Sequence, residues 1–167
     1  MFPDTDPEKA AECLRDTIKM AFPDVTFAEP ITGVDGLPNE ELDEEQALYG
    51  ALRGKKWSQV PLSVVAANPD GVVLLTDEAF AAFLPAWLNY ATTHTKIQEL
   101  MVYVFSPVVQ KSMEMMGRRI GLLSAPQKEA LRAFLSYCVM IELSNFREEA
   151  QHALAYVVGL SDEQRHS

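Results

Sequence analysis

The sequence predicts an all-α fold, a single-domain bundle of about six to seven short helices over residues 1–167. Apolar side chains recur at the three- and four-residue spacing of helix faces, and no stretch shows convincing strand alternation. Capping residues and prolines stand at the ends of the periodic stretches. The composition, 48% apolar and 23% charged, is typical of a globular domain with a sizeable core.

The first helix is expected to begin at Asp6-Pro7, because Asp is a favoured N-cap and Pro suits the first turn. Apolar residues follow at helical spacing until Phe22-Pro23 ends the helix. After an irregular stretch, Asp43-x-x-Gln46 resembles a capping box and opens a short helix over 47–53. Gly54 is expected to end that helix.

The middle of the chain predicts three further helical segments. Residues 61–67 suit one or two turns, and Thr76 caps a helix with acidic residues in its first turn. Pro85 should kink that helix or start a new one, because its ring does not fit a helix interior. Residues 97–105 form another amphipathic stretch, which Ser106-Pro107 closes.

The C-terminal part predicts two more helices. Ser124-x-x-Gln127 is a second capping box, and it leads into the clearest helical stripe of the chain, over 131–141. A last helix is expected from about Asn145 to Val158, ended by Gly159. Residues 161–167 are expected to form a frayed tail.

Charge is distributed unevenly along the chain. Residues 1–50 carry 13 acidic and 3 basic side chains, whereas residues 51–167 carry 11 of each. An acidic irregular segment, 23–45, contains eight acids and no Lys or Arg. Such a flank attracts cations or basic partners over long range, although a solvated charge run is the simpler interpretation. The residues expected to contact a basic partner are Asp35, Glu40, Glu41, Asp43, Glu44 and Glu45.

Several classes of partner and location are disfavoured. Nucleic-acid binding needs clustered Lys and Arg, and the basic clusters here are short. The apolar runs are too short to span a bilayer, and the N-terminus lacks the pattern of a secretion signal. Cys13 and Cys138 lie far apart among apolar neighbours, as buried reduced thiols do. We therefore expect a cytoplasmic protein that binds neither nucleic acid nor membrane.

Two blocks of the sequence resemble a known family. They are Gly54-Lys55-Lys56-Trp57-Ser58-Gln59-Val60 and the stretch Leu74-Leu75-Thr76-Asp77-Glu78-Ala79-Phe80-Ala81-Ala82-Phe83-Leu84-Pro85-Ala86-Trp87-Leu88, followed later by Leu123-Ser124-Ala125-Pro126-Gln127. In this order and spacing they are similar to a family of small bacterial proteins known only as a domain of unknown function. The resemblance covers residues 10–142, roughly, and implies one helical bacterial domain without implying an activity.

The aromatic residues of the second block have two interpretations. Phe80, Phe83 and Trp87 share one helix face, because they stand at i, i+3 and i+7. Together with Trp57 and Tyr90 they form either part of the core or the wall of a ligand pocket. Core packing is the simpler interpretation, since burying each large side chain stabilises the fold by about 1.5–3 kcal/mol.

The sequence supplies no complete catalytic or metal-binding motif. Glu149-x-x-His152 is half of a di-iron motif, and the second half is absent. There is no nucleophile elbow, dinucleotide fingerprint or phosphate-binding loop. We therefore predict no catalytic residues, no metal and no cofactor, and favour a protein that is not an enzyme.

Three functional hypotheses follow. The first is a non-enzymatic protein-interaction module whose acidic N-terminal surface meets a basic protein partner, as in immunity proteins or antitoxins. The second is a small-ligand binder or enzyme with a pocket near Trp57 and Trp87. The third is a structural homo-oligomer held by the region around Met113, Met115 and Met116, whose methionines suit either an interface or a core.

Overall fold

Helices make up the regular structure of this protein. The computed structural model describes residues 6–28, 30–32, 43–107, 113–141 and 146–165. Within these ranges it contains eight α-helices and two 3-10 helices, and its extended pairing is limited to a single bridge between Thr32 and Leu75. The prediction of an all-α fold is therefore confirmed.

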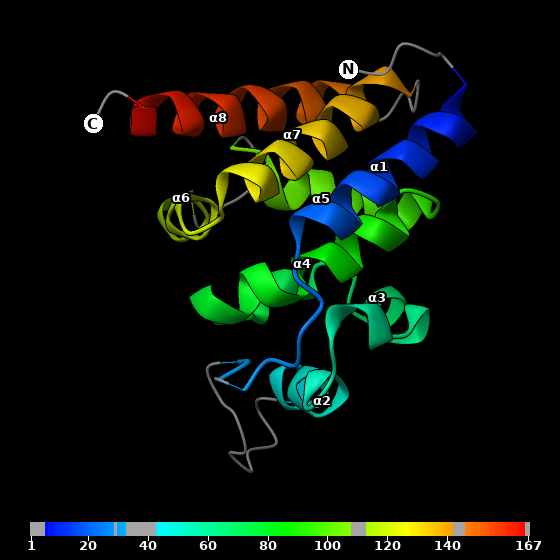
Figure 1. Cartoon of the computed structure of the whole chain (residues 1–167), viewed down its shortest axis with the longest axis vertical. Helices are drawn as coiled ribbons and strands as arrows, with labels where there is room; N and C mark the ends of the chain where they lie inside the picture. Colours follow the sequence, from blue (N-terminus) through cyan, green and yellow to red (C-terminus); the bar gives the residue numbers. More distant parts are fainter. Residues whose placement is uncertain (1–5, 29, 33–42, 108–112, 142–145, 166–167) are drawn as a thin grey trace.

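The helices are stacked along the long axis of the molecule (Figure 1). They are α1 (Pro7–Ala21), α2 (Asp43–Leu52), η2 (Trp57–Gln59), α3 (Leu62–Ala67), η3 (Gly71–Leu74), α4 (Asp77–Ala91), α5 (Thr95–Phe105), α6 (Met113–Gly121), α7 (Ala125–Met140) and α8 (Arg147–Arg165). Helix α7 packs on α1 and α8, and α5 packs on α4 and α8. The short helices α2 and α3 lie toward the end opposite α7 and α8, below α4 in Figure 1.

Three helices begin at the caps that the sequence predicts. Asp6 and Thr76 each accept a hydrogen bond from a backbone N–H of the following turn, at 3.0 and 3.2 Å. Ser124 and Gln127 form a complete capping box, with N···O distances of 3.0 and 3.3 Å. Gly54 has φ 73°, the left-handed conformation in which glycine follows the end of a helix.

Three predicted boundaries differ from the structure. Helix α2 includes Asp43, which was predicted to cap a helix over 47–53. Helix α4 runs through Pro85 as one element, so no new helix starts there. Helix α8 continues through Gly159 to Arg165, into the region predicted to be a frayed tail. Gly159 does not end the helix because it keeps a negative φ, and only a left-handed glycine turns the chain away. Helix α6 was not predicted as a helix.

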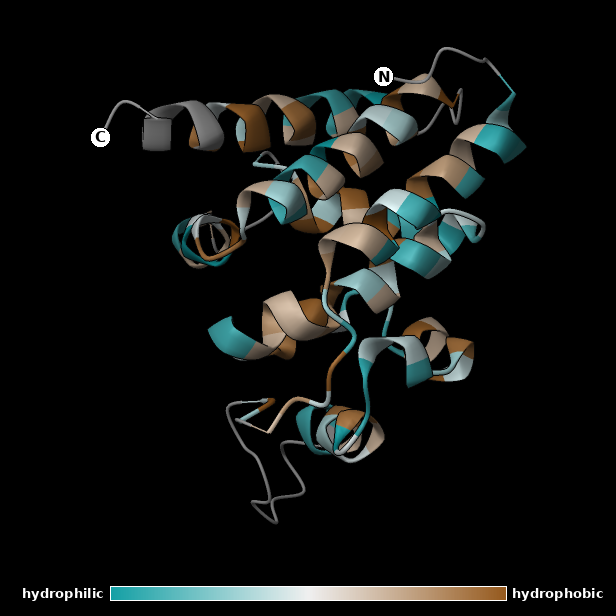
Figure 2. Cartoon of the chain, viewed as in Figure 1, coloured by the Kyte–Doolittle hydropathy of each residue, from teal (hydrophilic) through white to brown (hydrophobic). Residues whose placement is uncertain are grey.

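One continuous core joins all the long helices. Its largest fully buried side chains include Phe22, Phe80, Phe83, Trp87, Phe105 and Phe134. Helix α4 crosses its centre, and Figure 2 shows that α4 is hydrophilic at its first turn and hydrophobic along most of its remaining length. In the described part of the chain, no helix has both the length and the apolar character needed to cross a bilayer.

Candidate functional site

The acidic surface predicted from the sequence is only partly described. Asp35, Glu40 and Glu41 lie outside the described residues, and the side chain of Asp43 does too. Glu44 is exposed and Glu45 is half-buried, both in the first turn of α2. Acidic groups suit this position because the helix dipole is positive at its N-terminus.

Several exposed carboxylates of the first fifty residues form no ion pair with another described residue. The ion pairs between described residues join Asp77 to Arg118 and Arg119, and Glu129 to Arg132. All of them lie beyond residue 50. The carboxylates without an ion pair to another described residue include Glu8, Glu12, Asp16, Glu44 and Glu45. Among the described residues, the charge of these carboxylates is therefore not balanced by an ion pair.

Asp24 has a structural role instead. Its carboxylate accepts hydrogen bonds from the backbone N–H of Ser58, at 3.2 Å, and from the Ser58 hydroxyl. The indole N–H of Trp57 donates to the carbonyl of Phe22 at 3.4 Å. The segment after α1 is therefore held to η2 by both side chains, and Asp24 contributes less to a partner surface than the other acids.

Some of the aromatic residues that the sequence assigned either to the core or to a pocket wall lie in the core, and the others lie at the surface. Phe80, Phe83 and Trp87 are at most 1% exposed and belong to the core. The indole N–H of Trp87 donates to the carbonyl of Asn68 at 2.8 Å, which satisfies its polar edge inside the protein. Trp57 is 7% exposed and Tyr90 is half-buried, so these two reach the surface.

A hollow of about 270 Å³ lies where Trp57 and Tyr90 reach the surface, between α1, η2 and α4. Its lining consists of Arg15, Asp16, Lys19, Trp57, Ser58, Ala86, Asn89 and Tyr90. Trp87 does not line it. The hydroxyl of Tyr90 donates to the carbonyl of Val60 at 2.9 Å, and Arg15 donates to the hydroxyl of Thr92 at 3.1 Å. Its charged groups thus come from α1.

Sequence reasoning missed Arg15 and Lys19 as neighbours of Trp57. Their spacing of four residues places both on one face of α1, a signal that the sequence contains. What the sequence did not show is that this face of α1 lies beside η2 and α4. The carboxylates of Asp77 and Glu78, which could have served a catalytic pocket, begin α4 and do not line the hollow.

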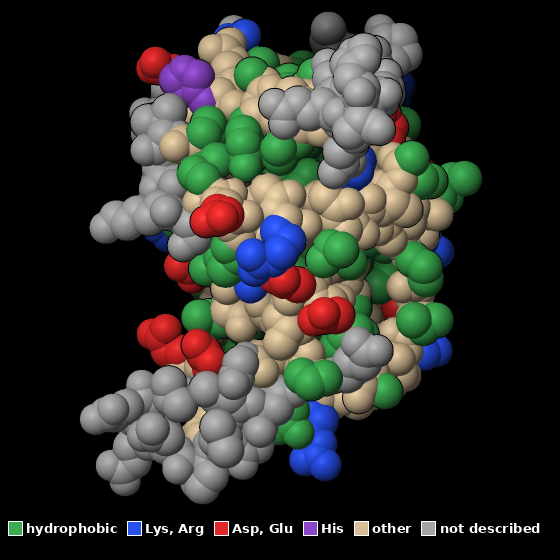
Figure 3. Space-filling model, turned by 90° about the vertical axis from the view of Figure 1, so that its left-hand side faces the viewer, with side chains coloured by type: hydrophobic (Ala, Val, Ile, Leu, Met, Phe, Trp, Pro, Cys, Tyr) green, Lys and Arg blue, Asp and Glu red, His purple; other side chains and the backbone are tan. Residues whose placement is uncertain are grey.

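Asp77 belongs instead to a cluster with two arginines. Its carboxylate accepts from Nε of Arg118 at 2.6 Å and from Nε of Arg119 at 3.1 Å. The hydrogen bond from Arg118 is the main cause that lowers the pKa of Asp77, and Arg119 adds to it. The first turn of α4 meets the last turn of α6 here. Figure 3 shows basic and acidic side chains in contact at the centre of the face that it presents. The carboxylate is therefore fully used in joining two helices.

The other residues that the sequence suggested for an interface or a metal site do not come together in the structure. Met116 is buried in the core, while Met113 and Met115 are half-buried. His152 is exposed and Glu149 is half-buried on α8. Among the described residues, no three His, Cys, Asp or Glu side chains come together as a metal site requires.

Comparison of the chain with protein-family models, with curated proteins and with solved structures returns no match. The family resemblance based on residues 54–57 and 74–88 therefore stays a prediction.

Proposed function

We propose that this protein is a non-enzymatic interaction module whose acidic N-terminal surface docks onto the basic surface of a protein partner, as an immunity protein or antitoxin does. The observation that carries the proposal is the acidic excess of the first fifty residues, in which Glu8, Glu12, Asp16 and Glu44 are exposed and form no ion pair with another described residue. Figure 3 shows acidic side chains toward the end of the molecule that carries α2.

The physical consequence of this charge is electrostatic steering. The net charge of −10 lies wholly in the first fifty residues, while the rest of the chain is balanced. A one-sided field of this kind accelerates encounter with a positive surface and disfavours acidic competitors. Because salt screens exposed charges over about 8 Å at physiological ionic strength, the association should be salt-sensitive.

The titratable groups with displaced pKa values support a binding role over catalysis. Burial raises the pKa of Tyr137 and of the Cys138 thiol, and both residues lie on the core side of α7. The displaced pKa of Asp77 has its cause in the arginine cluster between α4 and α6. None of these groups lines either of the two hollows formed by the described residues, whereas catalytic groups with displaced pKa values generally face a cleft.

The test begins with capture of a partner by the tagged protein at low and high salt, followed by binding kinetics with that purified partner. The charge-reversal variant replaces Glu40, Glu41, Glu44 and Glu45 with Lys. The control variant replaces four exposed acids outside the first fifty residues with Lys and so changes the net charge by the same amount. These acids are Asp70, Glu78, Glu114 and Glu148.

We expect the first variant to lower the association rate at least tenfold at low salt, and the control to lower it much less. The difference should shrink in high salt. Equal affinities of the two variants for the partner, or no partner captured at low salt, would contradict the proposal.

The hollow beside Trp57 favours a second candidate function, the binding of a small anionic ligand. Lys19 and the side-chain amide of Asn89 line it and make no hydrogen bond to another described residue, and Arg15 adds a second cation. Thermal shift with a panel of small phosphates and carboxylates tests this role. A stabilisation that disappears when both Arg15 and Lys19 are replaced by Ala would support it; no stabilisation by any compound would reject it.

A further inference from the structure

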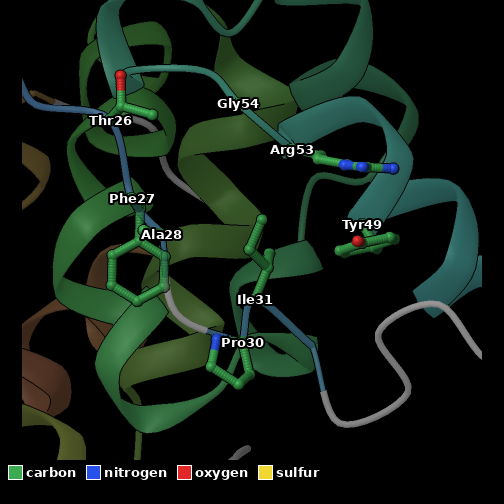
Figure 4. A pocket seen from close by; sticks show the side chains of 8 residues that line it. All are labelled: Thr26, Phe27, Ala28, Pro30, Ile31, Tyr49, Arg53 and Gly54. Atoms are coloured by element: carbon green, nitrogen blue, oxygen red, sulfur yellow. The ribbon is translucent and has the colours of Figure 1, made fainter.

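A larger groove lies between the segment that precedes Thr32 and helix α2. Its volume is about 480 Å³, within the range of ligand pockets. Figure 4 shows Phe27 and Ala28 on one side of it, Tyr49 and Arg53 on the other, and Ile31 between them. No motif in the sequence indicates this groove, because its two walls come from separate parts of the chain.

The floor of the groove is apolar and firmly supported. Ile31 is 3% exposed, and Phe27 is half-buried. The ring of Phe27 lies edge-on against Phe83 of α4, with centroids 6.0 Å apart. Because Phe83 belongs to the core, this contact fixes the position of Phe27. The floor therefore offers a rigid surface for one apolar side chain.

A cation stands at the rim. The guanidinium of Arg53 lies 5.9 Å from the ring centroid of Tyr49, a stacking that holds it beside the groove. Arg53 is exposed and forms no ion pair with another described residue. The backbone N–H of the next residue, Gly54, also makes no hydrogen bond within the described part. These donors suit a carboxylate.

The backbone along the other wall has open hydrogen-bonding groups. Residues 25–28 make no backbone hydrogen bond to another described residue. The segment is nevertheless tied down at both ends, by Asp24 to Ser58 and by the carbonyl of Pro30, which accepts from the hydroxyl of Thr76 at 2.6 Å. A fixed, open backbone edge is what an added peptide strand pairs with.

We propose that this groove binds the C-terminal end of an extended peptide with an apolar last residue. The last side chain would contact Phe27 and Ile31, the terminal carboxylate would bind Arg53 and Gly54, and the peptide backbone would pair with residues 25–28. A free organic acid matches the floor and the cation but leaves the open backbone unused, so the peptide is the better fit. This inference does not rest on the proposed acidic docking surface.

The experiment uses the full chain and a dye-labelled peptide, Gly-Ser-Gly-Thr-Val-Leu, with a free C-terminal carboxylate. The same peptide with a C-terminal amide and the free acid 4-methylpentanoate serve as comparison probes. Binding is measured by fluorescence polarisation, with the unlabelled acid as a competitor. NMR locates the contact through the backbone amide shifts of Thr26, Phe27, Ala28 and Gly54.

The free-carboxylate peptide should bind roughly ten- to a hundredfold more tightly than the amide, because a charged hydrogen bond is lost in the amide. Arg53→Gln should abolish this preference, and Arg53→Lys should retain part of it. Lys56→Gln is the matched control, since it removes one exposed cation outside the groove.

The proposal is overturned by equal binding of the two peptides, by no binding at millimolar concentration, or by shifts confined to other residues. Competition by 4-methylpentanoate at the affinity of the peptide would assign the groove to small acids instead. An unchanged circular dichroism spectrum of Arg53→Gln shows that any loss of binding is not a loss of fold.

Discussion

Arg119 places a guanidinium almost completely inside the protein, where its side chain is 6% exposed. It donates to the carbonyls of Val72, at 3.1 Å, and Val73, at 3.2 Å, and to the carbonyl of Leu75. Its charge is balanced by Asp77. The carbonyl of Val72 also accepts from the backbone N–H of Leu75, at 3.4 Å. Arg119 therefore adds charged hydrogen bonds to the carbonyls of a turn that is packed between the helices.

Replacement of Arg119 by Met should therefore destabilise the fold strongly. We expect the free energy of unfolding to fall by about 3 kcal/mol or more, because three carbonyls and the carboxylate of Asp77 lose their hydrogen bonds with Arg119 at once. Arg118→Met is the control, since Arg118 binds the same carboxylate but is 56% exposed. Urea denaturation of the two variants measures the difference, and similar losses in both would contradict this role of Arg119.

Asp77 should make stability depend on pH in the acidic range. Its pKa is lowered in the folded protein, chiefly by Arg118. The ionised carboxylate therefore stabilises the fold above the pKa of an unfolded Asp, about 3.9, and this contribution is lost as the pH falls through the native value.

Asp77→Asn should accordingly melt below the wild type at neutral pH, and the difference in Tm should narrow below about pH 4. Thermal unfolding of both proteins between pH 7 and pH 2 tests this. A difference in Tm that stays constant down to pH 2 would show that the ion pairs with the arginines are not its source.

At the scale of helices, the N-terminal caps that the local sequence predicts form the expected hydrogen bonds in the structure. The Ser124–Gln127 box closes both of its hydrogen bonds at the start of α7. Helix α7 packs on both α1 and α8, so its N-terminal turn supports a large part of the bundle. Helix ends are less well marked, as α8 shows by continuing through Gly159.

Ser124→Ala should lower the free energy of unfolding by about 1 kcal/mol, the usual effect of losing an N-cap hydroxyl. Ser63→Ala provides the control, because Ser63 is exposed within α3 and caps no helix. Chemical denaturation of both variants gives the comparison. Equal stabilities would indicate that the hydrogen bond from Gln127 N–H is replaced by water at no cost.

At the scale of the whole molecule, the hydrophobic core extends over most of the length of the chain, whereas the acidic excess is confined to the first fifty residues. One hydrophobic cluster extends from Ala10 of α1 to Val157 of α8, so the long helices fold as one unit. Both hollows described here border the segment between α1 and α2 or the residues that hold it in place. The acidic surface and the peptide groove thus lie in the same part of the chain, on a scaffold held by α4.

Much of the fold could be predicted from local pattern. The caps at Asp6, Thr76 and Ser124 and the apolar stripe on α4 rest on residues within one or two helical turns of each other. Such short-range chemistry is written directly in the sequence. Helix α6 was missed although Met113–Gly121 carries helix signals, with Glu114 in its first turn and Arg118 and Arg119 in its last. Its burial depends on contacts with α4 and α8.

The candidate sites could be predicted only in part. Trp57 and Tyr90 were expected near a pocket, and both line the hollow beside α1. Arg15 and Lys19 were not expected there, because nothing in the pattern of α1 shows which helix its polar face approaches. The groove at Phe27 and Arg53 was not expected for the same reason, since its walls meet only after the core has formed.

The amino-acid pattern alone thus determined the all-α class, the starts of the main helices and the acidic character of the first fifty residues. Those properties depend on composition and on neighbours along the chain. The tertiary structure decided that Trp87 lies inside while Trp57 borders a hollow, and that Arg53 faces Phe27 across a groove. Such pairings depend on packing between distant segments, which the order of residues within any one helix does not specify.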